Sequence, residues 1–387
     1  MSQIVRLQDV IVRFYTYEGI VKALEGVNLF VKKGETLGLV GETGCGKTMT
    51  GLSIFNLIPP PGKVVDGEIL FKTKSGETRN ILSLNETELQ KIRGAEISMI
   101  FQEPSSSLNP VYTIGDQISE VFLTHRRESL LKNVIESIEK DLEEKKNEVF
   151  RGLILRFEKS VYERMRTNPD SLTIKVLDRI PILRRYKRRI ELEAKKRTVK
   201  LLEELGIPDP ERVFGMYPHE LSGGMQQRAV IAMAIACNPI LLVADEPTTS
   251  LDVTIQARIL ELIKELKRRF DTTVLFITHD LGVIAEMCDR VAVMYAGNIV
   301  ELADVIEIFN NPLHPYTKGL MESIPQPGKE YKTIRGTVPN LINPPPGCRF
   351  HTRCDFKMDI CSKKRPNLIE VKKDHYVACH LYDGSGQ

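Results

Sequence analysis

Eight consecutive residues near the start of the chain have the types needed to bind the phosphates of a nucleotide. Residues 41–48, GETGCGKT, match the pattern G-x-x-x-x-G-K-[ST]. Gly41, Gly44 and Gly46 let the backbone wrap closely, so that its N–H groups point at phosphate oxygens. Lys47 would reach the β- and γ-phosphates, and the Thr48 hydroxyl would bind Mg²⁺. The segment follows an apolar run and opens a helical stretch, which is the context that a phosphate loop requires.

Two adjacent carboxylates stand at the end of a later apolar run. Leu242–Ala244 is followed directly by Asp245 and Glu246. A buried strand that ends in a carboxylate places Asp245 at one edge of a parallel sheet, near the Mg²⁺ of a bound nucleotide. Glu246 would orient or deprotonate the attacking water. Beside a phosphate loop, this pair favours a site that hydrolyses a nucleotide over two solvated surface acids.

A third motif, LSGGMQQR at residues 221–228, puts a Ser-Gly-Gly turn at the start of a predicted helix. A helix N-terminus carries unpaired N–H groups and partial positive charge, so Ser222, Gly223 and Gly224 form a second site suited to phosphate. One nucleotide does not need two such sites in one chain. Two chains arranged head to tail would use both, each turn closing over the nucleotide of the other chain.

The elements that must position these residues alternate between strand and helix. Residues 36–40, 239–247 and 272–280 are apolar runs that predict buried strands, and helical segments stand between them. Short strands with a partly alternating pattern open the chain before the phosphate loop. This alternation predicts an α/β fold with a mainly parallel sheet and helices on both faces.

On these motifs, residues 4 to 310 resemble the ATP-binding-cassette (ABC) family, for which the LSGGMQQR string is highly specific. The resemblance implies a P-loop ATPase core with an antiparallel β subdomain and a helical subdomain. It implies that Gln102 contacts Mg²⁺ and water and couples to membrane subunits, and that His279 contacts the γ-phosphate. Ser250-Leu251-Asp252 is similar to the dimer-interface loop of the family.

The family also places an aromatic side chain from near the N-terminus on the adenine. Tyr17 is our choice, and Phe14 and Tyr15 are close alternatives. The complete set of predicted site residues is then as follows. The catalytic residues are Glu246, His279 and Gln102; the nucleotide contacts are Tyr17, Gly41, Gly44, Cys45, Gly46, Lys47, Thr48, Met49, Gln102, Ser222, Gly223, Gly224 and Asp245; the Mg²⁺ ligands are Thr48, Gln102 and Asp245.

Four of the seven cysteines gather near the end of the chain, at Cys348, Cys354, Cys361 and Cys379. Their spacing, C-x5-C-x6-C-x17-C, differs from the paired C-x2-C of a zinc ribbon, and four thiolates suit either zinc or an iron–sulfur cluster. His375 and His380 are alternative ligands. A metal there would stabilise a C-terminal segment that lacks a hydrophobic core of its own.

The segment NPLHPYT at 311–317, followed by the cysteines, resembles the C-terminal extension of the oligopeptide/dipeptide importer subfamily of ABC proteins. The extension covers about residues 311 to 382. The resemblance implies a [4Fe-4S] cluster, with zinc as the alternative, and peptides as substrate; the same subfamily also imports oligosaccharides and nickel. We therefore expect two domains, a nucleotide-binding domain at 1–310 and the extension at 311–387.

The stretch from about His125 to Lys200 departs from the family in its length and high charge. We interpret it as an enlargement of the helical subdomain, which spans about 125–230. Its basic run, RRYKRR at 184–189, is open to three interpretations: part of a solvated helical hairpin, a contact with anionic lipid or a membrane subunit, or a contact with nucleic acid.

Composition narrows the class of protein. The 54 basic and 51 acidic residues leave a net charge of only +3, which argues against a dedicated nucleic-acid binder. The sequence shows no membrane span and no apolar stretch of a signal peptide. We therefore expect a peripheral protein on the cytoplasmic face of the cell membrane.

The expected function is the ATP-hydrolysing motor of an importer. Its expected partners are two integral membrane permease subunits, a second and related ATPase chain, and an extracytoplasmic substrate-binding protein. The alternative from another class is a soluble ABC ATPase that acts on nucleic acid or the ribosome. A chain with one cassette and a coupling-type glutamine does not favour that alternative.

Overall fold

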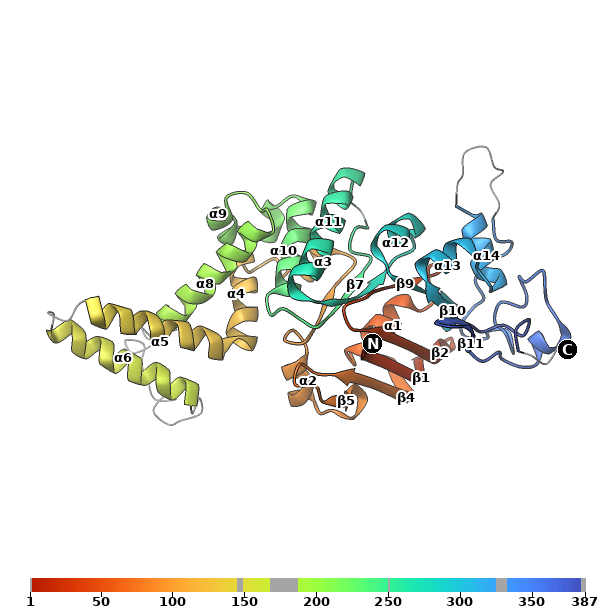
Figure 1. The fold of residues 1–387 in the computed structure, drawn as a ribbon, viewed down its shortest axis with the longest axis horizontal. Coiled ribbons are helices and arrows are strands. Elements are labelled where there is room, and N and C mark those ends of the chain that lie inside the picture. Colours follow the sequence, from red (N-terminus) through yellow and green to blue (C-terminus); the bar gives the residue numbers. More distant parts are fainter. Residues whose placement is uncertain (1, 145–148, 168–186, 250, 325–332, 384–387) are drawn as a thin grey trace. The chain divides into compact units, whose positions relative to one another are not determined.

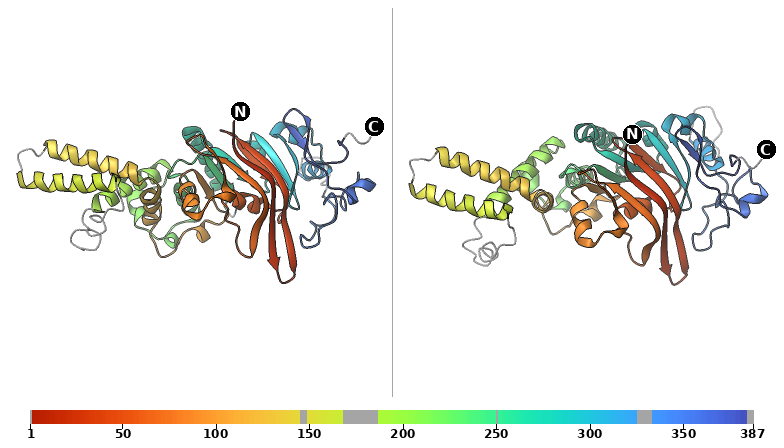
Figure 2. Two further views of the ribbon diagram at one scale, coloured as in Figure 1. Left: turned by 90° about the horizontal axis from the view of Figure 1, so that it is seen from below. Right: turned by 60° about the horizontal axis from the view of Figure 1, so that its bottom comes forward.

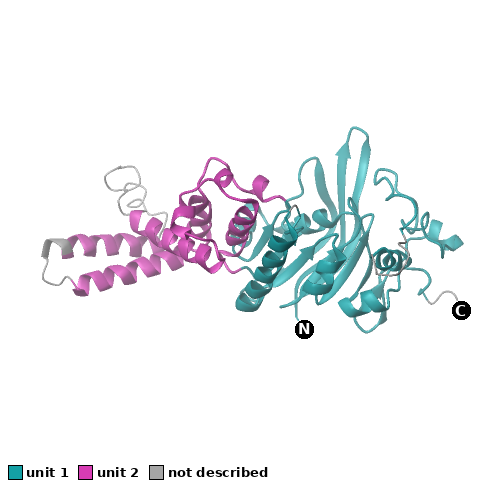
Figure 3. Cartoon of the chain, turned by 90° about the horizontal axis from the view of Figure 1, so that it is seen from above, with its two compact units in different colours: residues 1–102, 239–387 teal, residues 103–238 magenta. Residues whose placement is uncertain are grey.

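The computed structural model describes residues 2–144, 149–167, 187–249, 251–324 and 333–383. The chain divides into two compact units (Figure 3). Unit 1 comprises residues 1–102 and 239–387, and unit 2 comprises residues 103–238. Residues 184–186 of the basic run lie outside the described residues. Ser250 lies outside them as well.

Unit 1 contains a four-stranded antiparallel sheet in the order β2-β1-β4-β5 (Figures 1 and 2). Its strands are β1 (Gln3–Thr16), β2 (Gly19–Lys32), β4 (Gly62–Lys72) and β5 (Thr78–Asn80). Val5 and Leu7 and, after an irregularity in the strand, Val10 and Val12 are buried in β1, because one face of the sheet packs on the core. The antiparallel β subdomain that the resemblance implied is therefore present.

The second sheet of unit 1 has eight strands in the order β11-β12-β10-β9-β3-β8-β7-β6. The strands are β3 (Thr36–Val40), β6 (Ile97–Ile100), β7 (Leu241–Asp245), β8 (Thr273–Ile277), β9 (Arg290–Tyr295), β10 (Asn298–Asp304), β11 (Ile369–Lys372) and β12 (His375–Val377). From β9 to β6 all neighbours are parallel, and every residue of β3, β7 and β8 is buried. This confirms the predicted parallel core.

The other edge of that sheet is antiparallel. A two-residue turn joins β9 to β10, and both turn residues, Ala296 and Gly297, have positive φ, as a tight hairpin requires. Strands β11 and β12 come from the C-terminal segment, and β12 pairs with β10. The extension is therefore hydrogen-bonded into the same sheet that carries the phosphate loop.

The helices of unit 1 stand between its strands along the chain (Figure 1). They are α1 (Lys47–Ile54), α2 (Glu86–Ile92), α11 (Val253–Phe270), α12 (Leu281–Met287), α13 (Val305–Asn310) and α14 (Pro315–Glu322), with short 3₁₀ turns at Ile81–Ser83 and Asp359–Ser362. Helix α1 packs on β7 and β8, where Gly51 allows close approach to Val243 and Ile277. Helix α11 is amphipathic as predicted, with an Asp252 side chain that caps its first turn.

Unit 2 is helical. It contains α3 (Pro104–Ser107), α4 (Ile114–His125), α5 (Arg127–Glu144), α6 (Val149–Thr167), α8 (Lys187–Glu204), α9 (Pro210–Phe214), a 3₁₀ turn at Pro218–Glu220, and α10 (Gly223–Ile235). The charged stretch thus forms the helices α5, α6 and α8 among its described residues. Arg189 of the basic run pairs with Asp141 at 3.1 Å and Glu158 at 3.0 Å inside this unit. None of the helices in the described ranges combines the length and the apolar composition that a bilayer-spanning segment needs.

Candidate functional site

The phosphate loop stands where the sequence predicted it, between β3 and α1. Gly41 has φ 155° and a Cβ there would lie 2.1 Å from the carbonyl oxygen of Met294. Gly46 has φ 104°, and its Cβ would lie 2.9 Å from the carbonyl oxygen of Ala23. Both positions therefore require glycine for two reasons, the backbone conformation and the lack of space.

Lys47 lies within the loop and is only 6% exposed. Its Nζ donates to the carbonyl oxygens of Gly41 at 2.8 Å and Glu42 at 3.3 Å. Cys45 is fully buried, and its carbonyl oxygen accepts from the N–H of Gly297 at 2.7 Å. The loop is thus tied both to its own lysine and to the β9–β10 turn.

The remaining residues predicted for this loop differ in exposure. Gly44 and Thr48 are exposed, whereas Met49 is half-buried and packs against the apolar core. Exposure leaves the Thr48 hydroxyl accessible to a ligand, while Met49 contributes to packing.

Asp245 ends β7 and is 3% exposed, and its Oδ1 has no hydrogen-bond partner among the described residues. Burial, together with the nearby charge of Glu246, raises the pKa of Asp245 to about 6, against the opposing effects of Thr48 and Lys47. A buried carboxylate oxygen without a donor is suited to a cation. The residues present therefore fit a Mg²⁺ ion between Asp245 and Thr48.

Glu246 is the centre of a small polar network. Its Oε2 accepts from the Gln102 amide at 3.1 Å and from the Thr249 hydroxyl at 2.9 Å, and its Oε1 lies 3.1 Å from Nδ1 of His279. The structure thus brings together three residues, Gln102, Glu246 and His279, that are far apart in the sequence. Thr249 was not predicted, although its position three residues after Glu246 is a signal that could have indicated it.

Two physical features set Glu246 apart from an ordinary surface acid. Burial would raise its pKa, but the hydrogen bonds from His279 and Thr249 outweigh that effect, and the pKa lies below its usual value. Its backbone has φ 47°, a left-handed conformation that costs a non-glycine residue about 1 kcal/mol. Its N–H donates to the carbonyl oxygen of Ile277 at 2.8 Å, which holds this conformation. The side chain is therefore ionised and held in a fixed position.

The three aromatic candidates for adenine stacking differ in exposure. Tyr17 lies in the turn between β1 and β2 with its side chain fully exposed, and Tyr15 is 50% exposed. Phe14 packs against the core, with its ring close to Gly62. Tyr17 is therefore the most exposed of the three, whereas Phe14 is engaged in packing.

The Ser-Gly-Gly turn lies in unit 2 at the start of α10. Ser222 is the N-cap residue and makes no side-chain capping bond, and the first turn of the helix holds no acidic residue. Ser222 and Gly223 are exposed and Gly224 is half-buried. The Gln226 amide donates to the carbonyl oxygens of Pro218 at 2.8 Å and Leu221 at 3.3 Å, which fixes the turn. Such a helix start, without a competing carboxylate, is suited to an anion.

The four C-terminal cysteines do not form a metal site in this structure. Among the described residues, which include all four, no group of three or more His, Cys, Asp or Glu side chains could hold a metal ion. Burial raises the pKa of Cys379 to about 12, and the N–H of Cys348 donates to the carbonyl oxygen of Cys361 at 2.8 Å. The predicted zinc or iron–sulfur site is thus without support from the geometry.

The two histidines offered as alternative ligands have other partners. His375 is buried, with Nε2 at 2.8 Å from Oε1 of Glu301. His380 uses both ring nitrogens, with Nδ1 at 2.6 Å from Asp383 and Nε2 at 2.8 Å from the carbonyl oxygen of Lys364. The structure thus gives no support for these histidines as metal ligands, because both make hydrogen bonds with other groups.

Comparison with known proteins agrees with the geometry. The family model described as "ABC transporter" matches residues 24–249, and that described as "Oligopeptide/dipeptide transporter, C-terminal region" matches residues 300–361. The dipeptide transport ATP-binding protein DppD of Bacillus subtilis is 42% identical over 387 residues, which is 99% of this chain and 96% of that protein. The oligopeptide transport ATP-binding protein OppD of the same organism is 44% identical over 98% of this chain and 89% of that protein.

Solved structures give the same fold. A dimeric, post-hydrolysis state of the ATP-binding cassette MJ0796 bound to ADP and Pi is 25% identical, with a TM-score of 0.51 over 78% of this chain and 98% of that chain. A phosphate loop after a buried parallel strand, with Asp245 and Glu246 at the end of another, defines a P-loop ATPase. The chain belongs to the ABC transporter family, and it is an ATPase of that type.

Proposed function

We propose that this chain is the ATP-hydrolysing motor subunit of a membrane importer of dipeptides and oligopeptides. The observation that carries the proposal is the similarity over nearly the whole chain, C-terminal region included, to ATP-binding proteins of dipeptide and oligopeptide transport. Oligosaccharides and nickel remain alternatives for the substrate.

We propose the following roles for the residues of the site. The N–H groups of residues 41–48 and the Lys47 ammonium bind the phosphates of ATP, and Asp245 and Thr48 hold Mg²⁺, with Gln102 beside them. Mg²⁺ neutralises charge on the β- and γ-phosphates when it is bound. Glu246 accepts a proton from, or orients, the attacking water, and its short contacts with Gln102 and His279 support this role.

The partner chain supplies the other half of each site in this proposal. Ser222, Gly223 and Gly224 of one chain would close over the γ-phosphate bound by the other chain. Tyr17 of the chain that binds this nucleotide through residues 41–48 would stack on the adenine. The exposed start of α10 and the dimeric state of the related cassette MJ0796 support this arrangement. Residues Leu251 and Asp252 would lie at the interface.

The proposed partners are two integral membrane permease subunits, a related second ATPase chain and an extracytoplasmic binding protein. The chain would then be peripheral to the cytoplasmic face of the membrane. The test is affinity purification of the tagged chain from membranes, followed by identification of the bound proteins. Integral membrane proteins among them support the proposal, whereas ribosomes or nucleic acid would contradict it.

The substrate is tested separately, with peptide uptake in cells. Uptake of labelled di- and tripeptides should fall when Glu246→Gln replaces the native chain, and uptake of an unrelated amino acid should not change. If cells with Glu246→Gln take up peptides normally but lose uptake of oligosaccharides or nickel, the substrate is that alternative and not a peptide.

The metal at the cysteines is a distinct proposal. Its support is the presence of four cysteines in this segment, of which Cys348 and Cys361 are joined by a backbone hydrogen bond of 2.8 Å. The absence of a metal-holding group among the described side chains stands against it. Iron, sulfide and zinc assays on anaerobically purified protein decide it.

A further inference from the structure

Among the described residues, hydrogen bonds from two parts of the C-terminal extension converge on Glu42 of the phosphate loop. The Tyr316 hydroxyl accepts a hydrogen bond from the Glu42 N–H at 3.0 Å. Arg353 places Nη1 at 3.0 Å and 3.1 Å from the two carboxylate oxygens of Glu42. Tyr316 belongs to the HPYT segment and Arg353 to the cysteine segment, so both motifs of the extension meet at this position.

Glu42 also connects these contacts to the residue that would bind the phosphates. Its carbonyl oxygen accepts from Nζ of Lys47 at 3.3 Å, next to the 2.8 Å bond from Lys47 to Gly41. All three polar groups of Glu42 are therefore engaged: its N–H and carboxylate by the extension, and its carbonyl by Lys47. A shift of Glu42 would move the first turn of the loop and the lysine with it.

The two extension residues are themselves fixed. Tyr316 is fully buried, with its ring centroid 4.6 Å from that of Tyr295 and 5.4 Å from that of Phe350. The Arg353 side chain is 5% exposed, and its Nε donates to the carbonyl oxygen of Arg335 at 2.8 Å. Side chains held by packing and by several hydrogen bonds can position a neighbour, because they have little freedom of their own.

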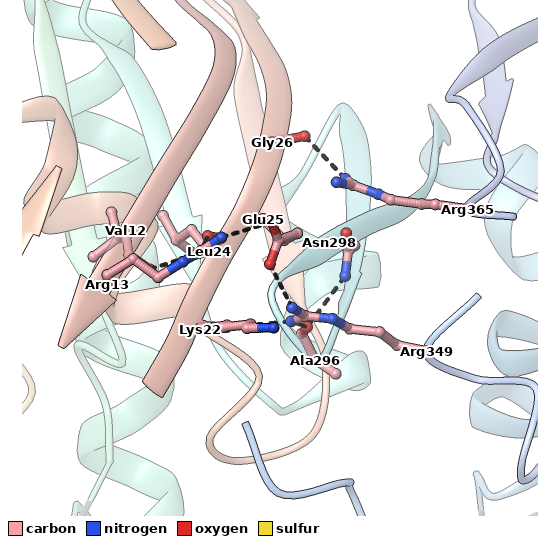
Figure 4. Close-up of polar contacts among 10 residues, drawn as sticks. All are labelled: Val12, Arg13, Lys22, Leu24, Glu25, Gly26, Ala296, Asn298, Arg349 and Arg365. Atoms are coloured by element: carbon pink, nitrogen blue, oxygen red, sulfur yellow. Dashed lines mark hydrogen bonds and ion pairs between the residues drawn. The ribbon is translucent and has the colours of Figure 1, made fainter. Parts of the chain in front are cut away.

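A second group of contacts anchors the same segment to the core (Figure 4). Arg349 donates to the carbonyl oxygens of Ala296 and Lys22, and its Nη2 lies 2.8 Å from a carboxylate oxygen of Glu25. Arg365 donates to the carbonyl oxygen of Gly26 at 3.1 Å. The extension is therefore fixed to the core near the phosphate loop, so its contacts with Glu42 can hold the loop in place.

We propose that Tyr316 and Arg353 are positioning residues that hold the phosphate loop, through Glu42, in the arrangement that binds ATP. The inference rests on the proposed assignment of residues 41–48 to the phosphates of ATP. Neither side chain needs to touch the nucleotide. When the contacts are removed, the loop samples other arrangements, and the apparent dissociation constant rises by the inverse of the fraction that remains competent.

The experiment compares two variants of the full chain, Tyr316→Phe and Arg353→Gln, with the native protein. Tyr316→Phe removes only the hydroxyl and leaves the ring in its packing. The measurements are the Kd for ATP, from titration with a fluorescent analogue, and the kcat and KM of hydrolysis. Each variant should bind ATP about fivefold more weakly with KM raised in parallel, while kcat at saturation changes little.

Matched controls in the extension separate positioning from general damage. Tyr382→Phe removes a hydroxyl that donates to the carbonyl oxygen of Leu313, and Arg335→Gln breaks an exposed pair with Asp355. Both should bind ATP like the native chain. Arg353→Lys should recover part of the ATP affinity lost in Arg353→Gln. The double variant Glu42→Gln, Arg353→Gln should bind ATP no more weakly than the weaker-binding of the two single variants, because both changes remove the same ion pair.

The outcomes distinguish this inference from the proposed function. Lys47→Ala should abolish ATP binding; if it binds normally, the assignment of the phosphate loop itself fails. If Lys47→Ala loses binding while Tyr316→Phe and Arg353→Gln bind ATP like the native chain, only the positioning role is overturned. A lower kcat with an unchanged KM in Tyr316→Phe would also overturn it, because a preorganised loop acts on binding.

Discussion

Replacement of Glu301 should weaken the attachment of the extension. It lies on β10 with no exposed surface. Its carboxylate accepts hydrogen bonds from the N–H groups of Leu313 and His314 and from Nε2 of His375, all at 2.8 Å. One buried carboxylate thus joins the core sheet to the start of the extension and to β12. The perturbation we choose is Glu301→Gln, which keeps the shape and removes the charge.

The magnitude follows from the three bonds. Glutamine has one carbonyl oxygen, which can take the place of Oε1 and keep the contacts with Leu313 and His375. Its NH₂ group then faces the N–H of His314, so one bond is lost and a buried donor is left unpaired, at a cost of about 2 kcal/mol. The two remaining bonds lose their charge assistance, which costs about 1 kcal/mol each. The total is about 4 kcal/mol.

Hydrogen–deuterium exchange on peptides covering residues 311–318 measures this effect locally. A loss of about 4 kcal/mol in local opening corresponds to roughly thousandfold faster exchange of the amides of Leu313 and His314. The control Asp355→Asn removes the charge from an exposed pair with Arg335, and it should change exchange by less than about fivefold. If Glu301→Gln exchanges like the control, the carboxylate is not what holds the extension.

The pH dependence gives an independent check on the same residue. The hydrogen bond from His375 and the backbone bonds outweigh burial and lower the pKa of Glu301. A carboxyl with a lowered pKa stabilises the folded state above its unfolded pKa, and the stabilisation is lost as the pH falls through the folded pKa. Exchange in the native chain should therefore approach that of Glu301→Gln as the pH falls below about 4.3. A constant difference between the two proteins down to acid pH would refute the reasoning.

Four further predictions concern the site and the cysteines. Glu246→Gln should keep ATP binding and lower the hydrolysis rate at least about a hundredfold, as measured by phosphate release; full activity would remove the proposed role of this residue. Lys47→Ala should lose ATP binding in the fluorescent-analogue titration because the ammonium that faces the phosphates is gone, and normal binding would contradict the assignment. Burial raises the pKa of Asp245 to about 6, so Mg²⁺-dependent ATP binding should weaken as the pH falls through that value and should release protons near pH 6; calorimetry in buffers of different ionisation enthalpy measures this release, and its absence would argue against Asp245 as a ligand. If the four cysteines bind a metal, removal with a chelator should lower the melting temperature of the native chain but not that of a Cys348→Ser, Cys354→Ser double variant, and equal melting temperatures with and without the chelator would exclude a structural metal.

The phosphate loop, the strand that ends at Asp245 and the start of α10 could all be predicted from the sequence. Each depends on a contiguous run of residue types, such as GETGCGKT after a buried strand, and local runs are visible in a single sequence. The parallel core sheet followed from the same alternation of strand and helix. The roles of Gln102 and His279 came from resemblance rather than from local pattern.

Other parts depend on contacts between distant residues, which no local pattern reveals. The sequence suggested a metal at Cys348, Cys354, Cys361 and Cys379, because four clustered cysteines are a ligand set by type. Ligand geometry depends on side-chain positions that spacing does not determine. Similarly, the sequence suggested His375 as a possible metal ligand, whereas in the fold its side chain contacts Glu301 on β10.

By itself, the sequence determined that this chain binds ATP as an ABC-type ATPase and that a distinct C-terminal segment follows. Only the tertiary structure decided how that segment is joined to the ATPase. It places Tyr316 and Arg353 on Glu42 of the phosphate loop, 274 and 311 residues away along the chain. The physical reason is that Tyr316 packs on Tyr295 of β9 and Arg349 donates to Ala296 in the β9–β10 turn, contacts that only the folded chain brings together.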